Sequence, residues 1–253
     1  MKRVDRDTSI ENIQIKPYKK DASYSYTLGA FPTYELILSR PDEVIKVLVH
    51  SSYTDMVGLE ALCKERNISL EVNDKLIGKL SDKDNCYVAG IFKKYSCQLS
   101  KERPHIVLVN PGNMGNLGTI IRTIVGFGIY DIAIILPGAD IFNPKTVRAS
   151  MGALFKLNFH FFNSFDEYRR QYGRHDIFTF MLNGEYTLNI KDCPKSKLFS
   201  LVFGNEATGL DDSFLNVGTS IMIPQSSDVD SLNLTIAVGI GAYVFMNENK
   251  IYK

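Results

Sequence analysis

The stretch "NPGNMGNLGTIIR" at residues 110–122 places three evenly spaced glycines between two apolar runs. The run before it, "HIVLVN" at residues 105–110, is typical of a buried strand. The run after it, "GTIIRTIVGFG" at residues 118–128, has the spacing of an apolar helix that carries a single arginine. The stretch therefore predicts a loop of small residues that joins a strand to the N-terminus of a helix.

The glycine spacing argues against the two common nucleotide-binding loops. The glycines are Gly112, Gly115 and Gly118, whereas a dinucleotide-binding loop needs G-x-G-x-x-G so that its backbone approaches the pyrophosphate. A P-loop needs Lys and then Ser or Thr after its last glycine, but Thr119 and Ile120 follow Gly118. A nucleotide-dependent oxidoreductase is therefore a disfavoured alternative.

What remains is an anion site at a helix N-terminus. Free backbone N–H groups and the helix dipole favour an anion there, such as a phosphate of a larger ligand. Arg122 lies about one helical turn beyond Gly118, so it either faces that anion or is a solvated surface charge. This segment alone leaves both interpretations open.

The rest of the chain divides into two parts. From Pro104 onward, apolar β-type runs alternate with helical runs, which is typical of a mostly parallel sheet covered on both faces. Residues 26–98 show a shorter α/β alternation and predict a small domain, and residues 1–25 predict an irregular arm. We place the domain boundary near residues 97–103. The predicted strands of the C-terminal part cover residues 105–110, 130–136, 156–162, 176–182, 197–204 and 219–224, and its helices cover residues 118–128, 144–152, 164–173, 210–216 and 231–248.

The composition limits the classes of function. A chain of 253 residues that is 45% hydrophobic is long enough for a substantial core. Its net charge of +1 argues against binding nucleic acid by bulk electrostatics, so any such contact must be local. The cysteines lack C-x-x-C spacing and suitably placed His partners, so we expect no metal site. Without a signal-peptide core or an apolar run of roughly 20 residues, the protein is expected to be cytoplasmic and to bind no membrane.

Two further segments help to interpret the stretch at residues 110–122. "LVFGNEATGL" at residues 201–210 places Gly204 and Glu206 in a turn directly after an apolar strand. "IPQSSDVDSLNLTIAVGI" at residues 223–240 begins the last helix, with Ser231 as its candidate N-cap. Taken alone, Glu206 would be a surface acid and Ser231 only a cap.

Together, the three segments resemble the signature motifs of the SpoU (TrmH) branch of the SPOUT RNA methyltransferases. The resemblance runs through N-x-G-x-x-x-R at residues 116–122, G-N-E-x-x-G-L at residues 204–210, and I-P followed by S-L-N at residues 223–233. "VRASMGALF" at residues 147–155 is also similar to the segment that this family has between its first two motifs. The resemblance covers residues 104–253.

The resemblance implies an α/β fold in two domains. The C-terminal domain, residues 104–253, would be a mostly parallel sheet with a deep trefoil knot, would bind S-adenosylmethionine through the knot loops, and would form a homodimer. Residues 26–98 are similar to the small L30e/L7Ae-like α/β domain that binds the substrate in many SpoU rRNA methyltransferases.

The implied reaction is methylation of a ribose 2′-hydroxyl in structured RNA, with rRNA favoured by the accessory domain. Arg122 would clamp an RNA phosphate and stabilise the developing alkoxide, because a guanidinium stays protonated and is a poor general base. Asn116 and Asn233 would orient Arg122 and the substrate. Glu206 would hold that network, and Ser231 would position the ribose or the arginine.

The binding residues follow from the same resemblance. S-adenosylmethionine would lie against Gly204, Leu210, Ile223 and Leu232, with Leu182 completing the adenine pocket. The candidates for RNA binding are the cations Lys16, Lys19, Lys20, Lys93, Lys94 and Arg148. The alternatives are a tRNA 2′-O-methyltransferase and a non-catalytic knotted RNA-binding protein.

Overall fold

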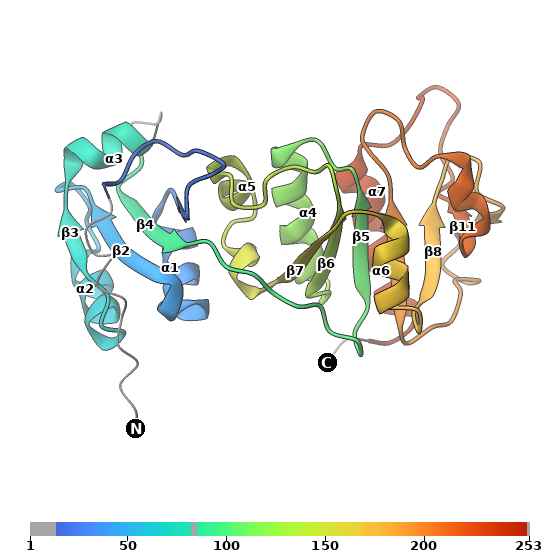
Figure 1. Cartoon of the computed structure of the whole chain (residues 1–253), viewed down its shortest axis with the longest axis horizontal. Coiled ribbons are helices and arrows are strands. Elements are labelled where there is room, and N and C mark those ends of the chain that lie inside the picture. Colours follow the sequence, from blue (N-terminus) through green and yellow to red (C-terminus); the bar gives the residue numbers. More distant parts are fainter. Residues whose placement is uncertain (1–13, 82–84, 252–253) are drawn as a thin grey trace. The chain divides into compact units, whose positions relative to one another are not determined.

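The computed structural model describes residues 14–81 and 85–251 and divides the chain into two compact units (Figure 1). The first unit holds Met1–Tyr95 and Phe142–Arg148, and the second holds Ser96–Ile141 and Ala149–Lys253. The break after Tyr95 lies just before the boundary that we placed at residues 97–103. The segment Phe142–Arg148 lies within the range that we assigned to the C-terminal domain, but it groups with the first unit.

The first unit is built on a four-stranded sheet in the order β1-β4-β2-β3. Only β2 and β3 pair in parallel. Its elements are β1 (Tyr24–Tyr26), α1 (Ala30–Ser39), β2 (Val44–Val49), α2 (Met56–Glu65), β3 (Leu70–Val72), α3 (Asp74–Leu80) and β4 (Val88–Lys93), with a 3-10 helix at Pro41–Glu43. The sequence pattern did not reveal β1, because so short a strand shows no alternation.

The predicted irregular arm, residues 1–25, is wrong at its end, because Tyr24 and Ser25 pair with β4 as part of β1. Residues 14–23 contain no helix or strand, and residues 1–13 lie outside the described residues. Two tyrosine hydroxyls of β1 hold this segment. The backbone N–H of Lys16 donates to the hydroxyl of Tyr24 at 2.8 Å, and that of Tyr18 donates to the hydroxyl of Tyr26 at 3.1 Å. The segment is therefore fixed on the edge strand of the sheet.

The second unit contains a seven-stranded sheet in the order β7-β6-β5-β10-β8-β11-β9, and every neighbouring pair is parallel. Its strands are β5 (His105–Val109), β6 (Asp131–Ile135), β7 (Asn158–Phe162), β8 (Asp176–Phe180), β9 (Tyr186–Thr187), β10 (Phe199–Phe203) and β11 (Thr219–Met222). The predicted parallel sheet is confirmed. The trefoil knot stays a prediction.

Helices follow most of these strands, as Figure 1 shows. They are α4 (Met114–Gly126), α6 (Phe165–Gln171) and α7 (Leu234–Glu248), with 3-10 helices at Ala153–Lys156 and Asp212–Asn216. The helix α5 (Pro144–Ala149) follows β6 in the sequence, but all of it except Ala149 belongs to the first unit. The helix predicted at residues 210–216 is therefore a short 3-10 helix, and the two-residue strand β9 was not predicted. Among the described residues, no helix has the length and apolarity needed to cross a membrane.

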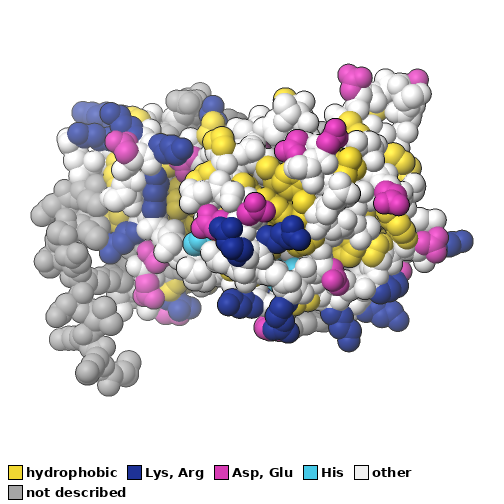
Figure 2. All heavy atoms as spheres, turned by 45° about the vertical axis from the view of Figure 1, so that its right-hand side comes forward, with side chains coloured by type: hydrophobic (Ala, Val, Ile, Leu, Met, Phe, Trp, Pro, Cys, Tyr) yellow, Lys and Arg dark blue, Asp and Glu magenta, His cyan; other side chains and the backbone are white. Residues whose placement is uncertain are grey.

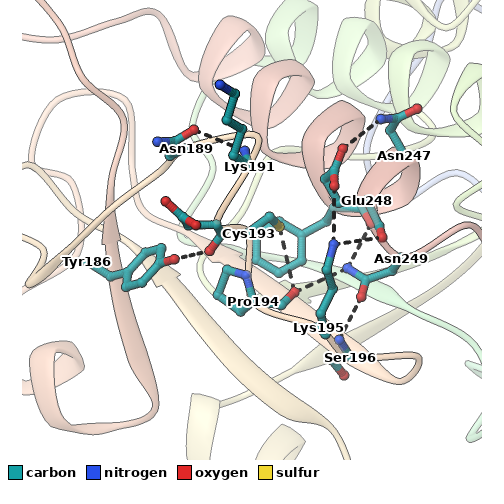
Figure 3. Close-up of polar contacts among 12 residues, drawn as sticks. Tyr186, Asn189, Lys191, Cys193, Pro194, Lys195, Ser196, Asn247, Glu248 and Asn249 are labelled. Atoms are coloured by element: carbon teal, nitrogen blue, oxygen red, sulfur yellow. Dashed lines mark hydrogen bonds and ion pairs between the residues drawn. The ribbon is translucent and has the colours of Figure 1, made fainter.

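The segment after β9 is fastened to the C-terminal end of α7 (Figure 3). The ammonium of Lys195 donates to the backbone carbonyl of Glu248 at 3.0 Å and pairs with its carboxylate at 3.2 Å. The side-chain oxygen of Asn249 accepts from the backbone N–H of Ser196 at 2.7 Å. Because a helix end leaves carbonyl groups without partners, these contacts stabilise α7 and tie it to the segment that enters β10.

A buried polar cluster lies where β5 begins. His105 is fully buried, with its Nε2 atom 2.7 Å from the carbonyl oxygen of Ser100 and its Nδ1 atom 2.9 Å from the hydroxyl of Tyr168. A carbonyl oxygen only accepts, so Nε2 carries the proton and Nδ1 accepts from Tyr168. Burial, together with the nearby His175, lowers the pKa of His105 to about 3.

We expect this cluster to make the fold sensitive to acid. The pKa of His105 falls from 6.5 in the unfolded chain to about 3 in the folded one, so its stabilising contribution is complete above pH 6.5 and is lost as the pH falls below that value. Measured by urea denaturation between pH 7 and pH 4, the unfolding free energy of the wild type should fall more steeply than that of His105→Gln, by at most about 1.4 kcal/mol per pH unit.

The matched control is Tyr172→Phe, because the Tyr172 ring lies 4.8 Å from that of His105. This variant removes a hydroxyl from the cluster but no imidazole. It should change stability without changing the slope against pH. Equal slopes for the wild type and His105→Gln would contradict the assignment.

Candidate functional site

Loops at the carboxyl ends of three strands surround one pocket. The strands are β10, β8 and β11, which are neighbours in the sheet, and their loops line a cavity of about 370 Å³ with the start of α7. The stacked rings of Phe180 and Phe203, 4.4 Å apart, contribute apolar surface. The cavity has the size of a small-molecule site. Its lining includes every residue that we predicted to hold S-adenosylmethionine, namely Leu182, Gly204, Leu210, Ile223 and Leu232.

One wall of the pocket is a close backbone crossing at Gly204. A Cβ atom there would lie 2.1 Å from the carbonyl carbon of Gly209 and 2.3 Å from the backbone nitrogen of Leu210. Backbone atoms cannot move aside as a flexible side chain does, so only glycine fits. The turn closes where Gly209, with φ 68°, donates its N–H to the carbonyl of Asn205 at 2.9 Å.

Glu206 joins this turn to the loop at residues 110–122. Its Oε2 atom accepts from the backbone N–H of Gly112 at 2.9 Å. Its Oε1 atom accepts from the backbone N–H of Asn113 at 3.1 Å and from the side-chain amide of Asn116 at 3.3 Å. Residues 94 positions apart are thereby held together by one carboxylate.

The anion at the N-terminus of α4 is therefore Glu206, and our interpretation of this end as a free phosphate site is wrong. Asn113 is the N-cap of α4 and accepts the N–H of Asn116 at 3.0 Å, which satisfies a further donor. Burial opposes the charge of Glu206, but the hydrogen bonds that it accepts from Gly112, Asn113 and Asn116 outweigh burial, so the pKa of its carboxyl lies below the ordinary value. The sequence could not show this pairing, because the carboxylate comes from a distant segment.

Sequence reasoning missed Asn205. Its side-chain amide donates to the backbone carbonyl of Asn110 at 2.7 Å, and its side-chain oxygen accepts from the N–H of Ala207 at 2.8 Å. Asn110 has the positive φ of 52° at the end of β5. The "GNE" triplet was the available signal, since an amide beside the acid makes a second link between the same two loops.

The third segment differs from expectation at its helix cap. Asn233, rather than Ser231, is the N-cap of α7, and its side-chain oxygen accepts from the N–H of Thr235 at 2.8 Å. Ser231 is exposed and lines the pocket two positions before the cap. An asparagine cap is as favourable as a serine cap, so the local sequence did not choose between them.

The predicted catalytic residues do not all meet in the pocket. Glu206 and Ser231 line it, and Asn116 reaches Glu206 from α4. Arg122 and Asn233 are exposed and lie outside the lining. Among the described residues, no hydrogen bond or ion pair engages the Arg122 guanidinium, which leaves it free to bind an anion.

The predicted RNA-binding cations differ in availability. Lys94 donates to the backbone carbonyl of Lys20 at 2.8 Å and lies 4.7 Å from the centre of the Tyr18 ring, so its charge is already engaged. Lys16, Lys19, Lys20 and Arg148 are exposed, and Lys93 is half-buried. On the right-hand side of Figure 2, Lys and Arg side chains lie along the lower edge and several Asp and Glu side chains lie higher, and further Lys and Arg side chains gather at the upper left.

Comparison with known proteins finds similarity to RNA methyltransferases. The model of the family "SpoU rRNA Methylase family" matches residues 103–243. A 23S rRNA (guanosine(2553)-2′-O)-methyltransferase of Bacillus subtilis is 31% identical over 132 residues, which cover 51% of this chain and 52% of the relative. A 23S rRNA (adenosine(1067)-2′-O)-methyltransferase of Streptomyces laurentii is 31% identical over 135 residues, covering 51% and 49%. The chain spans about half the length of the curated relatives it matches.

A solved structure extends the likeness to the first unit. The AdoMet-bound rRNA methyltransferase of Sinorhizobium meliloti is 26% identical to this chain with a TM-score of 0.72, and the match covers 89% of this chain and 87% of the other. Among the described residues, no group of three or more His, Cys, Asp or Glu side chains is placed to hold a metal ion.

Removing the Glu206 carboxylate should loosen the N-terminus of α4. We expect Glu206→Ala to lower the free energy of unfolding by about 1–3 kcal/mol, because three donors lose a shared charged acceptor. Amide hydrogen exchange at Gly112 and Asn113 should become faster.

The control is Glu167→Ala, which removes an acceptor at the start of α6 that lies 2.8 Å from the backbone nitrogen of Asn163. Glu167 does not line the pocket. It should cost some stability and leave exchange at Gly112 and Asn113 unchanged. Unchanged exchange at those two amides in Glu206→Ala would show that Glu206 does not hold the loop.

Proposed function

Since the family model covers more than half of it, the chain belongs to the SpoU rRNA methylase family, and we propose that it transfers the methyl group of S-adenosylmethionine to a ribose 2′-hydroxyl in structured RNA. The observation that carries the proposal is the convergence of two motif loops on one pocket, with Glu206 linking them to the helix that bears Arg122. A scaffold that only binds RNA need not keep this pocket.

The pocket suits a nucleoside that carries a cationic sulfonium. Leu182, Phe180 and Phe203 offer apolar surface to a purine ring. The charged lining residues, Glu206 and Asp230, are both carboxylates, and among the described residues no Lys, Arg or His joins them in the lining. A nucleotide polyphosphate would therefore be repelled. S-adenosylmethionine supplies an activated methyl group on its sulfonium.

The chain's own residues would position the ribose and stabilise charge. Arg122 would contact an RNA phosphate and the developing alkoxide, since a guanidinium forms strong charge-assisted hydrogen bonds. Glu206 is unsuited as a general base, because both of its oxygens accept hydrogen bonds and its pKa is lowered. Its role would be to hold Asn116 on the same helix as Arg122. Ser231, at the pocket, would contact the ribose, and Asn233 would orient it through the amide nitrogen that the helix cap leaves free.

We further propose rRNA as the substrate, with tRNA as the alternative. The names of the relatives from Bacillus subtilis and Streptomyces laurentii support rRNA. Residues 26–98, most of which lie in the first unit, would act as an L30e/L7Ae-like substrate-binding domain. Structured RNA is read largely through its shape and phosphates, which suits exposed cations on a fixed segment such as Lys16, Lys19 and Lys20. We also propose that the reaction takes place in the cytoplasm.

We also propose a homodimer that forms through α7. Ile236 is 54% exposed and Tyr243 is 47% exposed, and their seven-residue spacing puts them on one face of the helix. Exposed apolar stripes of this kind are common at protein interfaces. The exposed guanidinium of Arg122 lies on α4, which packs against α7, so the active site would lie near the interface.

The test of function combines donor binding with transfer. Calorimetry should show that the wild type binds S-adenosylmethionine, and Arg122→Ala should bind it within about twofold while losing at least about 100-fold in transfer to rRNA. Arg169→Ala, an exposed cation on α6, is the control and should transfer normally. Wild-type transfer by Arg122→Ala would refute the role of Arg122. Mapping 2′-O-methyl sites in total RNA with and without the protein would decide between rRNA and tRNA.

The dimer is tested by light scattering. The wild type should have the mass of two chains, and Tyr243→Asp should have the mass of one, because a buried carboxylate in an apolar interface is costly. Tyr130→Asp changes a tyrosine that is 38% exposed outside α7 and should stay dimeric. A monomeric wild type at about 10 μM would contradict the proposal.

A further inference from the structure

The two carboxylates of the pocket differ in how their charge is used. Glu206 accepts hydrogen bonds from Gly112, Asn113 and Asn116, so its charge serves the α4 terminus. Among the described residues, no hydrogen bond or ion pair reaches the carboxylate of Asp230. Asp230 therefore contributes the uncompensated negative charge of the lining.

The loop between β11 and α7 holds Asp230 at the pocket. The side-chain amide of Gln225, which also lines the pocket, donates to the backbone carbonyl of Asp230 at 3.3 Å. Ser231 and Leu232 follow directly and belong to the same lining. Asp230 is thus fixed beside residues that we assign to the donor and the ribose. Phe180 and Phe203 add apolar surface to the same cavity.

We propose that Asp230 makes the pocket discriminate between the cationic methyl donor and the neutral thioether that remains after transfer. The inference rests on the proposed function. In the reaction the bond from sulfur to the methyl carbon breaks and its electron pair stays on sulfur. The methyl carbon bonds to the ribose oxygen, and the hydroxyl proton passes to water. The bound ligand thereby loses one positive charge while Asp230 keeps its negative charge.

This change of charge makes the pocket bind the methyl donor more tightly than the product. Before transfer, Asp230 attracts the sulfonium; afterwards, that attraction is gone and the other contacts to the ligand are unchanged. Specificity is a difference between two affinities, and here the difference comes from charge rather than shape. Because Asp230 is exposed and screened by solvent, the effect should be modest, about threefold to tenfold in affinity at low salt.

The experiment compares three ligands by calorimetry at low salt. They are S-adenosylmethionine, S-adenosylhomocysteine, and sinefungin, which has an ammonium group in place of the methylsulfonium. Asp230→Asn should weaken binding of the two cationic ligands by about threefold to tenfold and leave S-adenosylhomocysteine within about twofold. Asp230→Glu should restore the wild-type preference. In the wild type, the preference for the cationic ligands should shrink as salt is raised.

Asp228→Asn is the matched control, because it removes the same charge from the same loop at a residue outside the pocket lining. It should leave all three relative affinities unchanged. Equal weakening of all three ligands by Asp230→Asn would mean that Asp230 only shapes the loop or contacts a group shared by all three, and would overturn the inference. So would unchanged affinities, or a wild-type preference that does not respond to salt.

Failure of the proposed function gives a different result. If the wild type binds none of the three ligands, the methyltransferase proposal itself fails. If it binds all three but Asp230→Asn keeps their ratio, only the inference about Asp230 fails. Thermal unfolding of ligand-free Asp230→Asn checks that the variant folds, and the salt dependence of the wild type tests the inference without any variant.

Discussion

The hydrogen bonds that Glu206 accepts hold the candidate site together. A single carboxylate binds two backbone N–H groups and one side-chain amide at the start of α4. It thereby joins the loop after β10 to the loop after β5, while Asn205 makes a second link between the same loops. The hydrogen bonds that Glu206 accepts lower the pKa of its carboxyl, so the charged link extends to more acidic solutions than for an ordinary glutamate. The position of Arg122 relative to the pocket depends on it.

Close backbone contacts give the pocket its shape. Gly204 leaves no room for a Cβ atom against Gly209 and Leu210. In the same way, a Cβ atom on Gly184 would lie 2.5 Å from the carbonyl carbon of Ile221. Such contacts occur where chain segments pass over one another at the carboxyl ends of the strands. At the C-terminal end of α7, Lys195 and Ser196 bind Glu248 and Asn249 and tie the helix to the segment that enters β10 (Figure 3). A rigid pocket suits methyl transfer, which depends on alignment more than on proton chemistry.

Charge explains how a nearly neutral chain could act on RNA. The charged residues of the pocket lining, Glu206 and Asp230, are both acidic. RNA phosphates would be repelled there, so affinity must come from elsewhere. The candidates for RNA binding are the exposed cations of the first unit and Arg122. Among the described residues, no hydrogen bond or ion pair engages the Arg122 guanidinium. The acidic pocket would then favour a cationic donor over a polyanion, and the two ligands would be bound by surfaces of opposite sign.

The alternation of apolar runs was sufficient to predict the parallel sheet, because a strand buried on both faces needs a continuous apolar sequence. The motif residues identified the pocket, since Gly204, Ile223 and Leu232 all line it. Local sequence did not reveal which asparagine or serine caps α7, because both are good caps, nor β9, because it is too short to show a pattern. Local sequence also did not reveal the role of Glu206. A helix N-terminus attracts any anion, and whether that anion is a ligand or a carboxylate 94 residues away depends on which segments the fold brings together.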